Sequence, residues 1–150
     1  MVDGLRTTYS DGMRRHPALI PLSHDHHHAL AQALRLRRAD DVTAGAVRDA
    51  FLTYAAADLE PHFQVEERAL ERIASMVESP AIVRAQERML ADHATLRGCI
   101  EQLRANDDGA PSAVDLVALG EALATHVRFE ERELFELLQR VLGDDLGAAL

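Results

Sequence analysis

The pattern L-x-x-H-x-x-x-E-E-R-x-L occurs twice in the chain, 64 residues apart. In each copy a histidine precedes a glutamate by four residues: His62 precedes Glu66, and His126 precedes Glu130. Side chains four residues apart lie on one face of a helix, separated by one turn. A histidine and a carboxylate in this arrangement form half of a metal site. Two such halves on two helices can hold a pair of metal ions between them.

Two further histidines lie in the apolar stripes of other predicted helices. His93 interrupts one stripe, and His26 interrupts another, with leucines four residues away on either side. His27 is the next best candidate on the first helix, and the remaining histidines of segment 24–28 are expected to be solvated or to support the site. Each of the four predicted helices thus contributes one histidine, and two of these helices also contribute a carboxylate. The predicted ligands are His26, His62, Glu66, His93, His126 and Glu130.

The chemistry of this ligand set points to a binuclear metal centre. Carboxylates buried in a helical core need a counter-charge, which metal ions supply. Four imidazoles and two carboxylates suit two ions, with the carboxylates bridging both ions and two histidines on each. Mixed imidazole and carboxylate ligation without a thiolate favours iron or manganese over a structural zinc.

Four amphipathic helices are predicted to position these side chains. The helical spacing of the apolar residues places them at about 22–39, 43–77, 80–105 and 112–142. Short connections between them imply an all-α, antiparallel up-down-up-down four-helix bundle. In such a bundle His62, His93 and His126 fall at nearly one level, whereas His26 fits less well. Pro61 lies inside the second helix and is expected to kink it.

The same spacing predicts the surroundings of the site. Phe63 and Phe129 are expected to wall it, and Leu52 to lie inward on the second helix. Leu137 and Val141 are expected to continue the inward stripe of the fourth helix.

Two glutamates directly follow the predicted carboxylate ligands. Glu67 and Glu131 are expected to lie at the surface, where each can pair locally with the arginine that follows it, Arg68 or Arg132.

The composition restricts the class of protein. The chain has 150 residues with a net charge of −9, which makes it a poor candidate for binding nucleic acid or anionic lipid. Its single cysteine, Cys99, excludes an intrachain disulfide. No signal peptide or membrane-spanning run is found, so we expect a cytoplasmic protein. Residues 1–20 are expected to form an N-terminal arm and residues 21–150 the bundle. The oligomeric state stays open.

Four segments together resemble the hemerythrin-like, or HHE cation-binding, family. They are P-L-S-H-D-H-H-H-A-L (21–30), H-F-Q-V-E-E (62–67), A-D-H-A-T-L (91–96) and H-V-R-F-E-E (126–131). The resemblance implies a non-haem centre of two iron ions, oxo- or hydroxo-bridged, with manganese or zinc as substitutes. It implies binding of oxygen, nitric oxide or a related small species, and it matches the predicted ligands of the second, third and fourth helices.

The chain departs from the oxygen-carrying members at two positions. A second histidine of the third helix is replaced by Arg97, and Glu131 stands where the fourth helix of those members has an aspartate. The pattern looks more like the bacterial sensor and repair branches. Sensing, storage or transport of a small diatomic ligand is therefore the main hypothesis. A redox enzyme of peroxide or nitric oxide chemistry, an iron donor for cluster repair, and a metal-free helical interaction module are the alternatives.

Overall fold

The chain is all-helical throughout the part that the structure describes. A computed structural model describes residues 14–106, 109 and 111–150, and every regular element within them is a helix. None of these helices is long and apolar enough to cross a membrane. The helices are α1 (Ile20–Arg37), α2 (Ala44–Tyr54), α3 (Glu60–Met76), α4 (Pro80–Ala105), α5 (Ala113–Phe129), α6 (Phe135–Leu142) and α7 (Leu146–Ala149).

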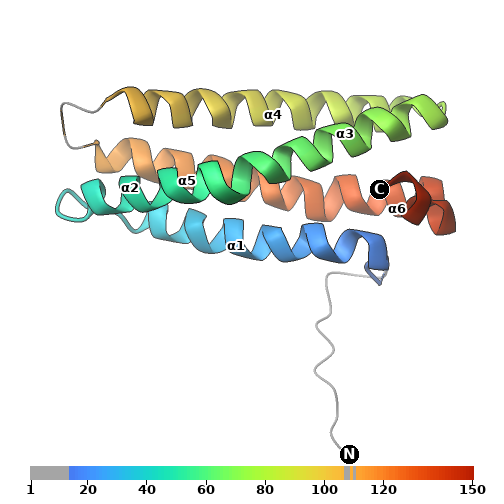
Figure 1. Cartoon of the computed structure of the whole chain (residues 1–150), viewed down its shortest axis with the longest axis horizontal. Coiled ribbons are helices and arrows are strands. Elements are labelled where there is room, and N and C mark those ends of the chain that lie inside the picture. Colours follow the sequence, from blue (N-terminus) through green and yellow to red (C-terminus); the bar gives the residue numbers. More distant parts are fainter. Residues whose placement is uncertain (1–13, 107–108, 110) are drawn as a thin grey trace, which may run out of the picture.

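The helices form four long rods that lie side by side (Figure 1). Two of the rods are α1 and α4. The other two are composite: a π-helical turn, Ala55–Leu59, joins α2 to α3, and a second one, Glu130–Leu134, joins α5 to α6. In Figure 1, α4 ends and α5 begins at the end of the molecule where the α1–α2 link lies, and the α3–α4 link lies at the other end. A helical bundle, as expected from the sequence, is thus confirmed.

Local sequence signals explain where the rods begin and end. The hydroxyl of Ser79 accepts a hydrogen bond from the backbone N–H of Ile82 at 3.3 Å, and Pro80 occupies the first position of α4. Helix α1 begins two residues earlier than expected, at Ile20. Pro21 fits the first helical turn because the backbone N–H that proline lacks would have no partner within the helix there. Gly143 ends α6 with a φ of 50°, which glycine adopts without strain.

The π-helical turn Glu130–Leu134 rotates the rest of the fourth rod relative to a regular helix. Each π-turn holds one extra residue, which shifts the buried face by one position. The expectation that Val141 lies inward is therefore wrong, since it is 39% exposed. Leu137 is partly buried and packs against the core, and Leu138 and Leu142 are the buried residues.

A similar shift occurs in the second rod. Phe51 is buried instead of the expected Leu52, which is half-buried. Pro61, where a kink was expected, follows the π-turn Ala55–Leu59 as the second residue of α3.

A buried polar layer divides the core into two apolar clusters. One cluster includes Phe51, Leu96 and Leu123, and the other includes Ile73, Met89 and Leu138. The residues directly before α1 also contact the bundle, since the backbone N–H of His16 donates to the side-chain oxygen of Gln139 at 3.0 Å. Residues 1–13 of the expected N-terminal arm lie outside the described residues.

Candidate metal centre

The six residues predicted as ligands lie together in the polar layer. They come from four rods, and none has more than 7% of its surface exposed. They form two groups whose potential ligand atoms lie within 4.8 Å of one another: His26, His62, Glu66 and Glu130 in the first, and Glu66, His93, His126 and Glu130 in the second. Both glutamates belong to both groups.

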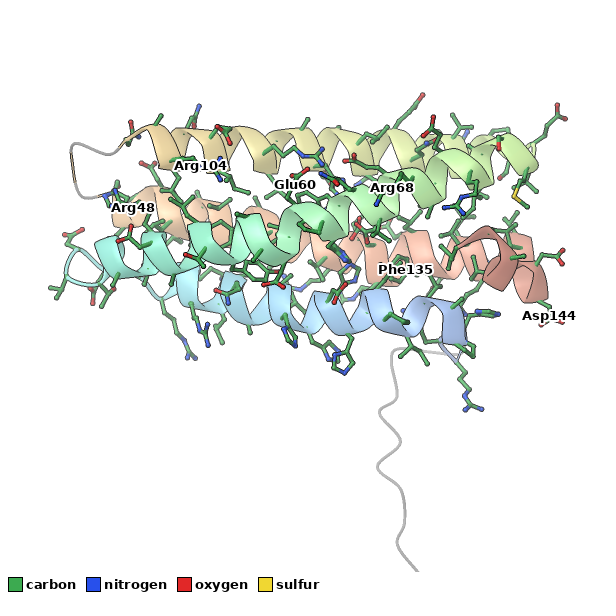
Figure 2. All side chains as sticks on the ribbon, in the orientation of Figure 1. Arg48, Glu60, Arg68, Arg104, Phe135 and Asp144 are labelled. Atoms are coloured by element: carbon green, nitrogen blue, oxygen red, sulfur yellow. The ribbon has the colours of Figure 1, made fainter. Side chains whose placement is uncertain are left out.

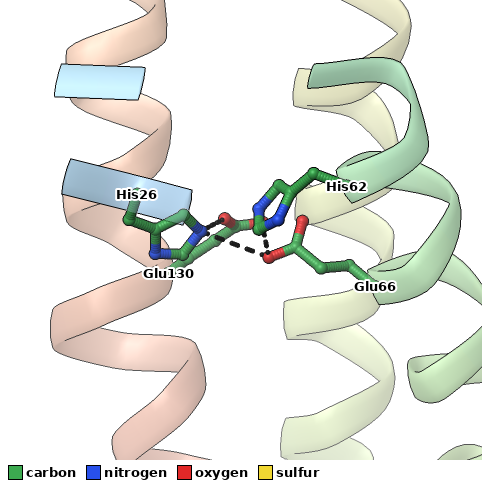
Figure 3. A group of neighbouring side chains, drawn as sticks. All are labelled: His26, His62, Glu66 and Glu130. Atoms are coloured by element: carbon green, nitrogen blue, oxygen red, sulfur yellow. Dashed lines mark hydrogen bonds and ion pairs between the residues drawn. The ribbon is translucent and has the colours of Figure 1, made fainter. Parts of the chain in front are cut away.

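In the first group the side chains point toward one another from α1, α3 and the fourth rod (Figure 3). The Nε2 atom of His26 lies 2.9 Å from Glu130 Oε2 and 3.3 Å from Glu66 Oε1. The Nε2 atom of His62 lies 3.0 Å from the same oxygen of Glu66. Two imidazole nitrogens and one oxygen of each glutamate thus surround a common point.

The second group uses the other oxygen of each glutamate. His93 Nε2 lies 3.5 Å from Glu66 Oε2 and 3.6 Å from Glu130 Oε1, and His126 Nε2 lies 3.1 Å from Glu130 Oε1. Each carboxylate therefore directs one oxygen at each pair of histidines. This is the arrangement that a bridging carboxylate requires.

The outer nitrogen, Nδ1, of every site histidine contacts a further carboxylate. The pairs are His26 with Glu131 at 2.7 Å, His62 with Asp25 at 3.1 Å, His93 with Glu67 at 2.8 Å and His126 with Asp92 at 3.3 Å. A carboxylate on Nδ1 fixes the ring and leaves Nε2 as the metal-binding nitrogen. The expectation that Glu67 and Glu131 lie at the surface and pair with Arg68 and Arg132 is therefore wrong.

Two arginines hold the outer carboxylates from the solvent side. Arg15 donates to Glu131 Oε2 at 2.8 Å. Arg97 donates to Glu67 Oε1 at 2.7 Å and makes two contacts of 2.9 Å with Glu60. Figure 2 shows Glu60 between α3 and α4. The Arg97 side chain thus supports the position of His93 through Glu67.

Aromatic rings close two sides of the centre. Phe63 stacks on His93 with ring centroids 3.8 Å apart, as the sequence led us to expect for a wall residue. The second wall is Phe135, stacked on His26 at 5.2 Å, whereas the expected Phe129 packs under the guanidinium of Arg88 at 3.9 Å. The π-turn that precedes Phe135 rotates it onto the site.

Protons on the imidazoles can balance the negative charge of the buried carboxylates. Burial by itself lowers the pKa of His26, but the adjacent carboxylates of Glu130, Glu131 and Glu66 outweigh burial and raise it to about 12. In the same way the pKa of His93 is raised to about 9. Burial and Glu66 favour protonation of Glu130, yet the surrounding imidazoles bring its pKa down to about 2. Imidazolium groups can therefore supply the counter-charge, and a metal ion has to displace their protons.

Several buried atoms of the site still lack a hydrogen-bond partner. They are His62 Nε2, Glu66 Oε2 and both side-chain oxygens of Glu130. The imidazole nitrogens approach these oxygens closely but without hydrogen-bond geometry. Buried polar atoms rarely stay unsatisfied in a folded protein, and coordination to a metal ion would satisfy all four. The residues present therefore fit a metal centre.

The sequence itself carries a signal for the outer carboxylates. Each half of the chain carries an Asp-His pair, followed by His-x-x-x-Glu-Glu. The aspartate of each pair, Asp25 or Asp92, and the second glutamate, Glu67 or Glu131, are the four outer partners. On α1 the structure turns His26 into the site, whereas its neighbour His27 is exposed.

The comparison with known protein families agrees with this geometry. The family model described as hemerythrin HHE cation-binding domain matches residues 19–138, which is well over half of the chain. No curated protein and no solved structure matches. This match, together with the buried histidines and glutamates, shows that the chain belongs to the hemerythrin HHE cation-binding domain family.

Proposed function

We propose that the protein binds two metal ions, and that these are iron, between the four site histidines and the two site glutamates. His26 and His62 would terminate one ion, His93 and His126 the other, and Glu66 and Glu130 would bridge them. The proposal rests on one observation: the two oxygens of each glutamate carboxylate face different histidine pairs. Imidazole and carboxylate ligands without thiolate support iron or manganese over a structural zinc.

The same proposal includes a small diatomic ligand. When bound, a pair of iron ions would supply electrons and open coordination positions to oxygen, nitric oxide or a related species. The chain's own residues position the ligands, since every imidazole is fixed through Nδ1, and Phe63 and Phe135 exclude water from two sides. Sensing, storage or transport of such a species is the function that we favour.

Arg97 supports a second candidate, a redox enzyme or iron donor. Its guanidinium is bound to Glu60 and Glu67, so among the described residues α4 contributes His93 alone to the two groups. One nitrogen ligand fewer than in a five-histidine centre leaves more room for a reacting molecule. Faster turnover of hydrogen peroxide or nitric oxide than by free iron would favour this candidate.

We also propose the finer architecture that the sequence suggests. The links between the rods alternate between the two ends of the molecule, which supports an up-down-up-down order (Figure 1). The family match over residues 19–138 supports one bundle domain that begins near residue 21.

Elemental analysis after anaerobic iron loading tests the proposed function, combined with an absorption spectrum before and after exposure to air. We expect two irons per chain and an absorption band that depends on oxygen. The double variant His62→Ala, His126→Ala removes one histidine from each group and should lose the bound iron. Full iron occupancy in this variant, or no metal in the wild type, would contradict the proposal and leave the metal-free interaction module as the remaining hypothesis.

A further inference from the structure

A surface cleft of about 220 Å³ lies against the metal centre, between α1 and the second rod. Its lining residues are Asp25, His28, Tyr54, Ala57, Asp58, Pro61, His62 and Val65. His62 is thus shared between the cleft and the predicted ligand set. It is also the most exposed of the six predicted ligands, at 7%, whereas the other five are 2% exposed or less. The cleft is therefore the place where the centre comes nearest to solvent.

Other sides of the centre are closed by side chains. His93 is fully buried beneath Phe63, and the guanidinium of Arg97 lies 5.5 Å from the centre of that ring. On the opposite flank Phe135 covers His26. Among the described cavities, none but the cleft at His62 is lined by a predicted ligand.

The cleft carries the charge and the ligand types that attract a metal cation. Asp25 and Asp58 contribute carboxylates, and His28 contributes an imidazole. Burial and the two carboxylates raise the pKa of Tyr54, so its hydroxyl stays protonated and neutral at pH 7. His62 borders the cleft with its Nδ1 atom on Asp25, and its buried Nε2 atom, which faces the centre, has no hydrogen-bond partner. A divalent cation drawn in by the aspartates would meet the His62 side chain next.

We propose that this cleft is the entrance through which divalent metal ions reach the centre, with Asp58 at its rim attracting the cation and His62 as the first ligand to receive it. The inference rests on the proposed metal centre. It adds the route by which metal enters and the order in which the two positions are filled. The position at His26 and His62 receives metal before the position at His93 and His126, and the shared glutamates connect the two positions.

A matched pair of variants in the π-turn Ala55–Leu59 tests the route by volume. Ala57 lines the cleft, whereas its neighbour Ala56 is exposed toward a separate groove beside α4. Ala57→Leu fills part of the cleft, and Ala56→Leu adds the same side chain on the other face. Metal-free protein is mixed with Co²⁺, and the visible absorption of the bound ion is followed in a stopped-flow instrument. We expect Ala57→Leu to load several-fold more slowly and Ala56→Leu to load at the wild-type rate.

A second pair of variants tests the charge without changing the volume. Asp58→Asn removes a carboxylate at the rim, and Asp41→Asn removes an exposed one in the α1–α2 link, about 20 Å away along the rod. At about 0.1 M ionic strength charges act over about 10 Å, so Asp58 contributes to attraction and Asp41 does not. We expect Asp58→Asn to lower the loading rate about three- to tenfold. Asp25 is unsuitable for this test, because its carboxylate also contacts His62 Nδ1.

The amount of metal bound at equilibrium separates the two possible failures. Slower loading of Ala57→Leu and Asp58→Asn, with unchanged stoichiometry and unchanged controls, supports the entrance. Equal loading rates for all four variants, with full stoichiometry, would overturn the entrance while the proposed metal centre stands. Absence of bound Co²⁺ in the wild-type protein would overturn the proposed centre itself.

Discussion

Each site histidine uses its two ring nitrogens for different purposes. Nδ1 contacts an outer carboxylate, and Nε2 faces the shared glutamates. A fixed ring keeps its inner nitrogen in one place and reduces the conformational entropy that is lost when a metal binds. The outer carboxylate also makes the imidazole a more basic ligand. The four outer carboxylates should therefore contribute to metal affinity without touching the metal.

Glu131→Gln tests this contribution at one histidine. The amide keeps the shape of the side chain but loses the charge that faces His26 Nδ1 and Arg15. We expect metal affinity to fall about tenfold to a hundredfold, measured by competition with a chromophoric chelator.

The matched control for that variant is Glu133→Gln in the same π-turn. Glu133 is exposed and pairs with Arg88 at 3.4 Å. Metal affinity should stay at the wild-type value in this control. Equal affinities in the two variants would mean that the outer carboxylate does not act on the centre.

Helices α1 and α5 approach each other closely at Gly120. A Cβ atom built on Gly120 would lie 2.7 Å from the backbone oxygen of Ala33 and 2.9 Å from the Cβ atom of Leu36. A backbone oxygen cannot move aside like the end of a flexible side chain. The absence of a side chain at residue 120 thus allows α1 to lie against α5 and to bring His26 to the other ligands.

Gly120→Ala should therefore separate these two helices. We expect a loss of about 1–3 kcal/mol in the free energy of unfolding, measured by urea denaturation. Gly98→Ala on α4 is the control, because a Cβ atom there meets nothing within 4 Å. That control should gain about 0.5–1 kcal/mol from better helix propensity. A Gly120→Ala protein as stable as the wild type would show that α1 and α5 can separate without cost.

The π-turn Glu130–Leu134 holds one residue more than a regular helix needs. The buried residues after Glu130, which are Leu134, Phe135 and Leu138, each lie one position later than the face of a regular α-helix would place them, as if one residue had been inserted. Removal of an exposed residue from the turn should leave their positions unchanged.

Deletion of Arg132 is therefore expected to be tolerated, with a melting temperature within about 5 °C of the wild type. Deletion of Arg128, an exposed residue of regular α5, rotates everything after it by about 100° and should cost about 3 kcal/mol or more. Circular dichroism during heating measures both. Equal losses in the two deletions would contradict the role given to the π-turn.

Over the whole molecule, a charged layer interrupts what would otherwise be one apolar core. Glu66 and Glu130 are at most 1% exposed and lie between the two apolar clusters. In the metal-free protein their charge is offset by protonated imidazoles. Metal ions would offset it more strongly and would connect all four rods at one level. Folding and metal binding should therefore be coupled.

The melting temperature should rise when metal binds. A metal concentration about a thousand times the dissociation constant stabilises the folded chain by about 4 kcal/mol. For a chain of this length that corresponds to a rise of about 10 °C, measured by calorimetry with metal and with a chelator. The double variant His62→Ala, His126→Ala should show no rise. A rise of the same size in that variant would place the bound metal elsewhere.

The sequence by itself determined the helical class and the family, and it indicated the six buried histidines and glutamates. It could do so because burial on a helix repeats every three to four residues, so a polar residue that interrupts the apolar stripe is visible without coordinates. The structure brings these six residues together. That they bind metal remains a prediction.

Only the tertiary structure decided the contacts made between rods. The pairing of Asp25 with His62 joins residues 37 positions apart, and no period along the chain specifies it. Phe135, and not Phe129, forms the second wall of the site. A prediction from helical spacing assumes the same number of residues in every turn, and the π-turn Glu130–Leu134 changes that number. The cleft at His62 arises in the same way, from the packing of α1 against the second rod. Such features depend on how neighbouring surfaces fit, which the order of residues in one helix does not express.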